Sequence, residues 1–249
     1  MNRVLLALIA GGFTWFITLL GALSVFFFKK INNKFLCKAL AFSAGVMVSS
    51  SFWSLLLPAF NMLKTINVFS ILSIVFGLSL GIIFVYISDI LMDKFSKRDN
   101  KKNILLALAM TIHNIPEGFV IGVASAGIGN GFNYVPFIML TLGIAIQNFP
   151  EGMCVSLPLR SSGSSKFKSF FIGQISAFVE PISAVIGALF IVHIKILLPV
   201  FLSFAAGAML VVSLRELILE SFSINKNSGT FYFFIGFIIL MFLDMLFGC

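Results

Sequence analysis

The sequence Asn-x-Pro-Glu-Gly occurs twice in this chain, each time in the middle of a long apolar run. Residues 103–127 read NILLALAMTIHNIPEGFVIGVASAG, and residues 134–159 read YVPFIMLTLGIAIQNFPEGMCVSLPL. Each run is long enough to cross a hydrocarbon core of about 30 Å as an α-helix. A carboxylate in the middle of a membrane helix costs a few kcal/mol or more, so its presence there indicates a function.

The composition excludes an ordinary soluble protein. Of the 249 residues, 59% are hydrophobic and only 10% are charged, whereas soluble domains carry about 25% charged residues. No loop is long enough to fold by itself, so we expect a single transmembrane domain covering residues 1–249. The apolar runs predict an all-α integral membrane protein with eight spans, near residues 3–28, 35–60, 68–92, 103–127, 134–159, 168–194, 197–220 and 230–247.

Lysine and arginine residues predict the orientation of the chain. Thirteen of the 17 lie in four loops, at residues 29–38, 93–103, 160–169 and 221–229. Loops rich in lysine and arginine stay on the cytoplasmic side. We therefore expect these loops in the cytoplasm, both termini outside, and the protein in the cell membrane (inner or plasma membrane). The net charge of +8 is then a topology signal, and no nucleic acid partner is expected.

Two internal matches predict an inverted repeat. Spans four and five share the Asn-x-Pro-Glu-Gly sequence, while residues 42–47 (FSAGVM) in span two match residues 204–209 (FAAGAM) in span seven. The members of each pair are an odd number of spans apart, so they cross the membrane in opposite directions. Inverted repeats are typical of transporters that work by alternating access. The expected layout is three spans, a central pair and three spans (3+2+3).

The polar side chains of spans four and five share one face of each helix. His113 lies four residues before Glu117, and Gln147 lies four residues before Glu151, so both members of each pair point to the same side. Two facing antiparallel helices would bring these groups to a common point. The proline of each motif also frees the carbonyl oxygen four residues earlier, which is a further possible cation ligand.

Three further polar residues accompany this face: Asn114, Asn148 and Glu180, the last in the middle of span six. Such side chains can serve as interhelical hydrogen-bonding groups. However, three carboxylates at one depth repel one another unless a cation lies among them. A mixed set of nitrogen and oxygen ligands favours a divalent transition metal such as zinc or iron.

A pair of membrane helices with His-Asn-x-Pro-Glu-Gly and Gln-Asn-x-Pro-Glu-Gly, fourth and fifth of eight, closely resembles the ZIP (Zrt/Irt-like protein) family of divalent metal transporters. The similarity is strongest to its prokaryotic GufA-like branch. Residues 44–55 in span two and residues 205–217 in span seven also look like that family. The resemblance covers essentially the whole chain and makes a homodimer an expectation.

The resemblance implies two adjacent metal positions that share Glu117 and Glu151 as bridging ligands. The first position would be formed by His113, Glu117, Gln147 and Glu151, with Met47 nearby. The second position would be formed by Asn114, Glu117, Asn148, Glu151 and Glu180. Two residues depart from the family pattern: Gln147 stands where many members have histidine, and Asn148 stands where related transporters carry an acid. The second position therefore has less negative charge than expected.

The predicted function is import of Zn²⁺ into the cytoplasm through this site, with Fe²⁺, Mn²⁺, Cd²⁺ and Co²⁺ as further possible substrates and membrane lipids as surroundings. Asp244 near the outer face, and Asp89 and Glu220 near the inner face, could line the entry and the exit. Two alternatives stay open. An intramembrane metal-dependent hydrolase would need a metal with an open position and a bound water, and a cation channel would show conductance. Since no His-Glu-x-x-His sequence is present, we expect no enzyme activity.

Overall fold

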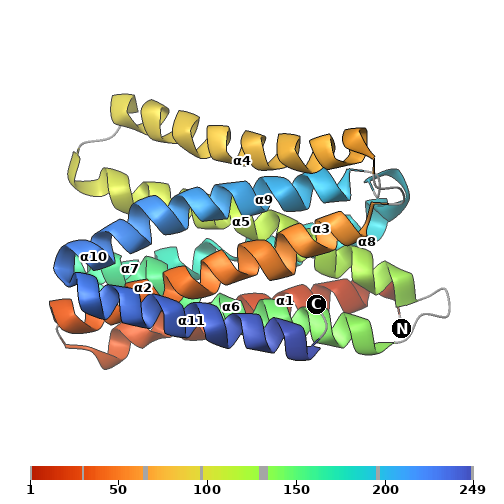
Figure 1. The fold of residues 1–249 in the computed structure, drawn as a ribbon. Coiled ribbons are helices and arrows are strands. Elements are labelled where there is room, and N and C mark those ends of the chain that lie inside the picture. Colours follow the sequence, from red (N-terminus) through yellow and green to blue (C-terminus); the bar gives the residue numbers. More distant parts are fainter. Residues whose placement is uncertain are drawn as a thin grey trace.

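The computed structural model describes residues 2–29, 31–63, 67–95, 98–128, 134–194 and 197–247. Within these ranges the chain is helical and contains no strand, as the sequence predicts. The helices run side by side in one bundle (Figure 1). They are α1 (Arg3–Phe27), α2 (Asn33–Ser50), η1 (Ser51–Leu56), α3 (Leu57–Asn61), α4 (Val68–Phe95), α5 (Arg98–Ile128), α6 (Tyr134–Ser161), α7 (Lys166–Ile175), α8 (Val179–Ile194), α9 (Leu198–Val212), η2 (Ser213–Ile218), α10 (Leu219–Ile224) and α11 (Lys226–Phe247).

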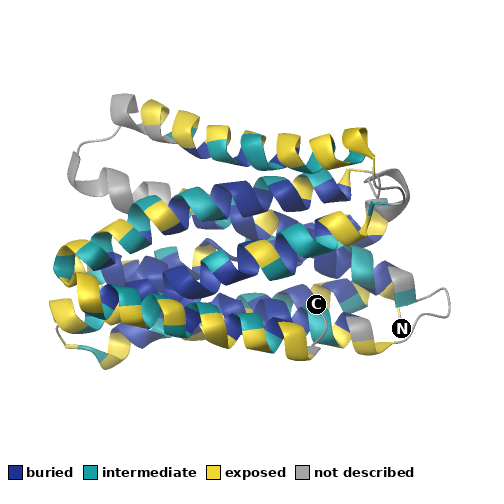
Figure 2. Cartoon of the chain, in the orientation of Figure 1, coloured by how far each residue is buried: buried dark blue, intermediate teal, exposed yellow. Residues whose placement is uncertain are grey.

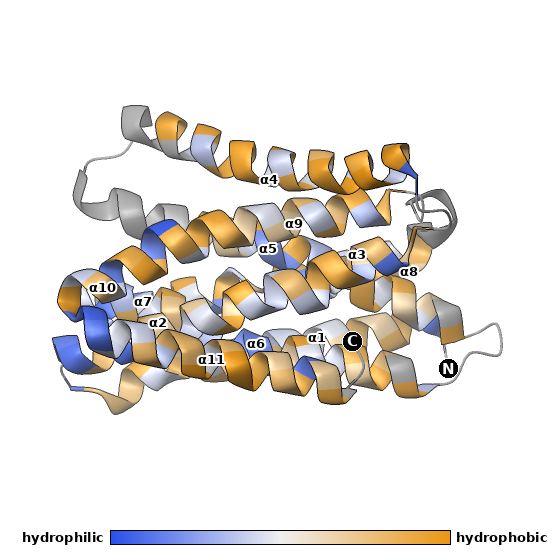
Figure 3. Ribbon diagram, viewed as in Figure 1, coloured by the Kyte–Doolittle hydropathy of each residue, from blue (hydrophilic) through white to orange (hydrophobic). Residues whose placement is uncertain are grey.

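Each of the eight predicted spans coincides with one helix or with consecutive helical segments. In the described residues, seven helices are long and apolar enough to cross a membrane. The remaining predicted span, 103–127, lies in α5, a helix of 31 residues whose side chains are described only in part. The outer faces of α4 and α11 are exposed (Figure 2) and largely hydrophobic (Figure 3). An apolar outside with polar groups buried inside is the arrangement that a lipid environment requires.

Glycine allows four pairs of helices to approach closely: α1 with α6, α5 with α8, α2 with α11, and α4 with α9. In each pair, two glycines face a backbone carbonyl of the partner so closely that an added Cβ would lie between 2.0 and 2.4 Å from its oxygen. Small residues at helix interfaces are a common way to pack membrane helices. The glycines are Gly21 and Gly152, Gly122 and Gly187, Gly45 and Gly236, and Gly81 and Gly207.

Two short π-helical segments interrupt the second and seventh spans. They are η1 (Ser51–Leu56) and η2 (Ser213–Ile218), and they begin 162 residues apart. The same separation relates residues 42–47 to residues 204–209, which match in sequence. Single π-helical turns inside α-helices occur frequently at functional sites. The two spans therefore share a backbone irregularity as well as a sequence pattern.

The sixth span is not one continuous helix. The sequence predicts a single helix over 168–194, but residues 176–178 form a turn between α7 and α8. Pro181 contributes to this break, because it has no N–H to donate to the carbonyl of Ala177; that carbonyl instead accepts from the N–H of Glu180 at 3.0 Å. The break places Glu180 in the first turn of α8.

The indole of Trp15 on α1 fixes the end of α7. Its Nε1 donates to the carbonyl oxygen of Gln174 at 3.1 Å and lies 3.2 Å from Oε1 of the same residue. The ring also contacts the edge of Phe178, with 5.4 Å between the ring centroids. Trp15 therefore contacts residues before and within the break.

Candidate metal centre

Three side chains from α5 and α6 converge in the interior of the bundle. His113 and Glu117 lie one turn apart on α5, and Glu151 extends toward them from α6. The Nε2 of His113 lies 3.2 Å from Oε1 of Glu117 and 3.1 Å from Oε1 of Glu151. Each of the three residues offers one possible ligand atom within 4.8 Å of the others, and all three are buried. The helical spacing read from the sequence therefore brings these groups together as expected.

Gln147 joins the cluster one turn before Glu151. Its Nε2 donates to Oε1 of Glu117, and its Oε1 accepts from the hydroxyl of Ser50 on α2. Both side chains are buried. Ser50 is a site residue that the sequence did not reveal, because serines are common in membrane helices and no spacing distinguishes this one. Its contact links α2 to the helices that carry the carboxylates.

A second group of polar side chains lies around Glu180. The Nδ2 of Asn148 lies 2.9 and 2.8 Å from the two carboxylate oxygens of Glu180, and 3.1 Å from the carbonyl oxygen of Thr14 on α1. Asn148, Glu180 and Thr14 are all buried. This group thus joins α1, α6 and α8.

The remaining residues of the predicted site lie elsewhere in the same interior. The Nδ2 of Asn114 donates to the carbonyl oxygen of Ser176 at 3.2 Å, in the break between α7 and α8. Met47 is fully buried on α2, one turn before Ser50. The structure thus brings His113, Glu117, Gln147 and Glu151 to one point, and the asparagines of the two motifs form hydrogen bonds beside this cluster.

Several buried polar atoms of this interior make no hydrogen bond to any described residue. A buried acceptor without a partner costs about 1–3 kcal/mol, so their number at one place indicates that the interior is built for something else to bind. A divalent cation can be coordinated by several such oxygen and nitrogen atoms at once. The atoms are Nδ1 of His113, Oδ1 of Asn114, Oε2 of Glu117, Oδ1 of Asn148 and Oε2 of Glu151.

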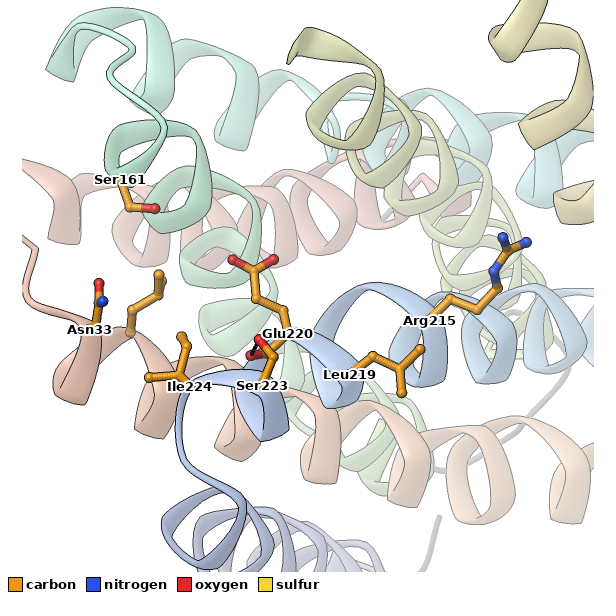
Figure 4. A pocket seen from close by; sticks show the side chains of 8 residues that line it. Asn33, Ser161, Arg215, Leu219, Glu220, Ser223 and Ile224 are labelled. Carbon is orange, nitrogen blue, oxygen red and sulfur yellow. Dashed lines mark hydrogen bonds between the residues drawn. The ribbon is translucent and has the colours of Figure 1, made fainter. Parts of the chain in front are cut away.

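The predicted entry and exit residues lie in different settings. Asp244 is buried on α11 and accepts a hydrogen bond from the hydroxyl of Ser54 on η1 at 3.0 Å. Glu220 lines a pocket of about 460 Å³ together with Asn33, Ser161 and other side chains from α2, α6, η2 and α10 (Figure 4). The side chain of Asp89 lies outside the described residues.

Arg215, another residue at that pocket, lies well inside the predicted span 197–220. Its guanidinium lies over the ring of Tyr86 on α4, 4.9 Å from the ring centroid. Such cation–π contacts stabilise a partly desolvated cation. The contact explains how a guanidinium is accommodated between α4 and η2.

The chain matches the family model of the ZIP zinc transporters over residues 98–244, which is more than half of its length. It is 31% identical to zinc transporter ZIP11 of Bos taurus, with 96% of each chain covered. It is also 31% identical to zinc transporter ZupT of Clostridium perfringens, with 99% of this chain and 97% of that protein covered.

A shorter match, 36% identical, joins 58% of the chain to 56% of zinc transporter GufA of Myxococcus xanthus. All of these relatives are named as transporters and none as an enzyme, in agreement with the sequence prediction. Together with its long apolar helices, these similarities show that the chain is a multi-pass membrane protein that belongs to the ZIP family of zinc transporters.

Proposed function

We propose that the protein imports Zn²⁺ into the cytoplasm by alternating access, and that the ion binds at His113, Glu117, Gln147 and Glu151. The convergence of the histidine and the two glutamates within 4.8 Å carries this proposal. One imidazole nitrogen and two carboxylates are a ligand set that Zn²⁺ prefers, and zinc takes four ligands in a tetrahedral arrangement. An ion here would replace the hydrogen bond from Gln147 to Glu117, and the amide oxygen of Gln147 would become the fourth ligand. Met47, buried one turn from Ser50, adds a soft sulfur atom near the site.

The proposed topology is eight spans in a 3+2+3 inverted repeat within one transporter domain, with both termini outside and the lysine-rich loops in the cytoplasm. The equal spacing of η1 and η2 supports the repeat, since their separation of 162 residues is also that of the matching sequences. The four glycine-lined pairs support it as well. Gly45 of α2 lies against α11, while Gly207, at the equivalent position of α9, lies against α4.

The proposed path for the ion enters near Asp244 and leaves near Glu220. Asp244 is a buried carboxylate with one hydrogen bond, from Ser54. Glu220 lies at the pocket that also contains Ser161, the last residue of α6. A carboxylate at each end of the bundle would attract cations and lower the cost of bringing them to the central site.

Uptake of radioactive Zn²⁺ into proteoliposomes of the purified protein tests the proposal. Saturable uptake is expected in the wild type, and both Glu117→Gln and His113→Ala should abolish it together with bound metal. His193→Ala is the matched control, because it removes the only other histidine of the chain, and its uptake should equal that of the wild type. Wild-type uptake by Glu117→Gln would refute the site.

The same vesicles test the other proposed substrates, the homodimer and the two alternative functions. Competition with Fe²⁺, Mn²⁺, Cd²⁺ and Co²⁺ ranks these further proposed substrates, and chemical crosslinking in the vesicles tests the proposed homodimer. Ohmic currents at channel rates would replace the carrier by a cation channel. Hydrolysis of a peptide or ester by the purified protein, lost in Glu151→Gln, would revive the hydrolase alternative.

A further inference from the structure

The amide nitrogen of Asn148 lies among three oxygen atoms in the way that a small cation would. Two of them are the carboxylate oxygens of Glu180, at 2.9 and 2.8 Å, and the third is the carbonyl oxygen of Thr14, at 3.1 Å. An amide nitrogen carries two hydrogens and no negative charge. It can therefore satisfy the Glu180 carboxylate from the place where the resemblance leads one to expect a second metal ion.

The chemistry of the surroundings fixes which end of the Asn148 amide faces Glu180. The reverse orientation would point the amide oxygen at a buried carboxylate, and two acceptors at hydrogen-bond distance repel each other. Only a cation or a proton between them would make that orientation favourable. The observed contacts therefore satisfy both carboxylate oxygens of Glu180 without a metal.

The carboxylates are also unevenly shared between the two positions. Glu117 and Glu151 both point their Oε1 atoms at His113, within 3.2 and 3.1 Å. An ion held there uses these two Oε1 atoms. Glu180 is then the one carboxylate of the expected set that belongs to the second position alone, which Glu117 and Glu151 could reach only with their Oε2 atoms. The other expected ligand, Asn114, uses its amide nitrogen on the carbonyl oxygen of Ser176.

We propose that the side-chain amide of Asn148 takes the place of a second cation, so that the protein binds and moves one divalent ion at a time. The proposal rests on the function proposed above and specifies the ion count of the same site. Asparagine and aspartate have the same shape, so Asn148→Asp replaces a donor by an acceptor without changing the packing. The new carboxylate would lie among three oxygens, and their repulsion would be relieved by a proton or by a bound cation. With Zn²⁺ in excess at neutral pH, we expect the divalent ion to displace the proton. This single substitution should therefore create the second metal position.

Counting bound metal tests this proposal without measuring transport. Purified protein in detergent is dialysed to equilibrium against Zn²⁺, and the ions per chain are measured by mass spectrometry of the metal. We expect one ion per chain in the wild type and two in Asn148→Asp. Cadmium NMR of Cd²⁺-loaded protein should correspondingly change from one resonance to two.

Two further variants serve as matched controls. Asn148→Ala removes the donor without adding charge and should keep one ion per chain. Glu180→Gln, added to Asn148→Asp, removes the carboxylate of the new position and should return the count from two to one.

The outcomes separate this proposal from the function on which it rests. Two ions per chain in the wild type would overturn the role of Asn148 and leave zinc transport standing. No bound ion and no uptake in the wild type would instead refute the proposed function. One ion per chain in Asn148→Asp, with a gel-filtration profile like that of the wild type, would also contradict the proposal. If Asn148→Asp does not fold, the number of ions per wild-type chain and the number of cadmium resonances of the wild type test the proposal by themselves.

Discussion

Two groups of helices in this bundle pack through the same glycine–carbonyl contacts but differ in the polar side chains that they contribute to the site. The site group consists of α1, α5, α6, α7 and α8, and the companion group consists of α2, α4, α9 and α11. Each contains two pairs of helices in which glycines face the partner's carbonyls. His113, Glu117, Glu151 and Glu180 all lie in the site group, whereas the companion group contributes Ser50 and the neighbouring Met47. Close helix packing is therefore separable from the chemistry of the site.

The strongest test of this comparison removes one buried carboxylate from each group. Glu151→Gln in the site group should weaken Zn²⁺ binding about 100-fold, which corresponds to about 2.8 kcal/mol, because a charged ligand is replaced by a neutral one. Asp244→Asn in the companion group should leave the equilibrium affinity unchanged, since Asp244 contacts Ser54. Isothermal titration calorimetry measures both. Equal losses in the two variants would remove the distinction between the groups.

The next test adds one methyl group to each kind of helix pair. A Cβ at Gly118 would lie 2.3 Å from the carbonyl oxygen of Glu180, and a Cβ at Gly81 would lie 2.0 Å from that of Phe204. Overpacking of this kind costs about 1–3 kcal/mol, so both Gly118→Ala and Gly81→Ala should lower the melting temperature. Only Gly118→Ala should also weaken Zn²⁺ binding, by about tenfold, because it displaces the helices that carry the ligands.

Gly12→Ala is the control for both glycine variants, because a Cβ at Gly12 meets nothing within 4 Å. It should change neither the melting temperature nor the affinity. Thermal unfolding in detergent measures the melting temperature, and metal titration measures the Zn²⁺ affinity. If Gly81→Ala weakened binding as much as Gly118→Ala, the packing of the companion group would be part of the site.

A smaller effect is expected at the contact that joins the two groups. Ser50→Ala removes the hydroxyl that donates to Gln147 and so the contact that holds this side chain in the cluster; a hydrogen bond of this kind contributes about 0.5–1.5 kcal/mol. Zn²⁺ affinity should fall about tenfold, since Gln147 is then free to leave the cluster. The adjacent Ser49 is the matched control, because it is buried and its hydroxyl has no partner among the described residues. A similar loss in Ser49→Ala would show that the effect is not specific to Gln147.

The smallest expected effect lies at the proposed entry. Ser54→Ala removes the donor to Asp244 but touches no residue of the central cluster. The concentration of Zn²⁺ at half-maximal uptake should rise about twofold, which is about 0.4 kcal/mol, while the equilibrium affinity stays constant. Ser54→Thr keeps the hydroxyl and should behave like the wild type. A changed equilibrium affinity for Zn²⁺ in Ser54→Ala would contradict this prediction, because it would show that Ser54 influences binding at the central site.

The sequence predicted the helices and the convergence of His113, Glu117 and Glu151, because both follow from local rules. Apolar runs give the spans within a few residues, and a spacing of four places His113 and Glu117 on one face of α5. The choice of partner does not follow from spacing. Asn114 and Asn148 occupy equivalent positions of the two motifs. Asn114 donates to the backbone carbonyl of Ser176, whereas Asn148 donates to the Glu180 carboxylate as well as to a backbone carbonyl.

The π-helical segments and the contact of Ser50 were missed for a related reason. The segments SFWSLL and SLRELI share serine as their first residue and leucine as their fifth, which is too little to predict an irregular turn. The contact of Ser50 depends on how α2 packs against α6, and hydropathy describes each helix alone. Interactions between distant helices are therefore the part that only the structure supplies.

The position of Trp15 gives the protein an intrinsic optical reporter. The chain has two tryptophans, so in a Trp53→Phe background all indole fluorescence comes from the ring that binds Gln174 and touches Phe178. Breaking the hydrogen bond of an indole N–H shifts its emission to shorter wavelength. A blue shift on adding Zn²⁺ would therefore record, in real time and without any label, the separation of α1 from the break that precedes Glu180.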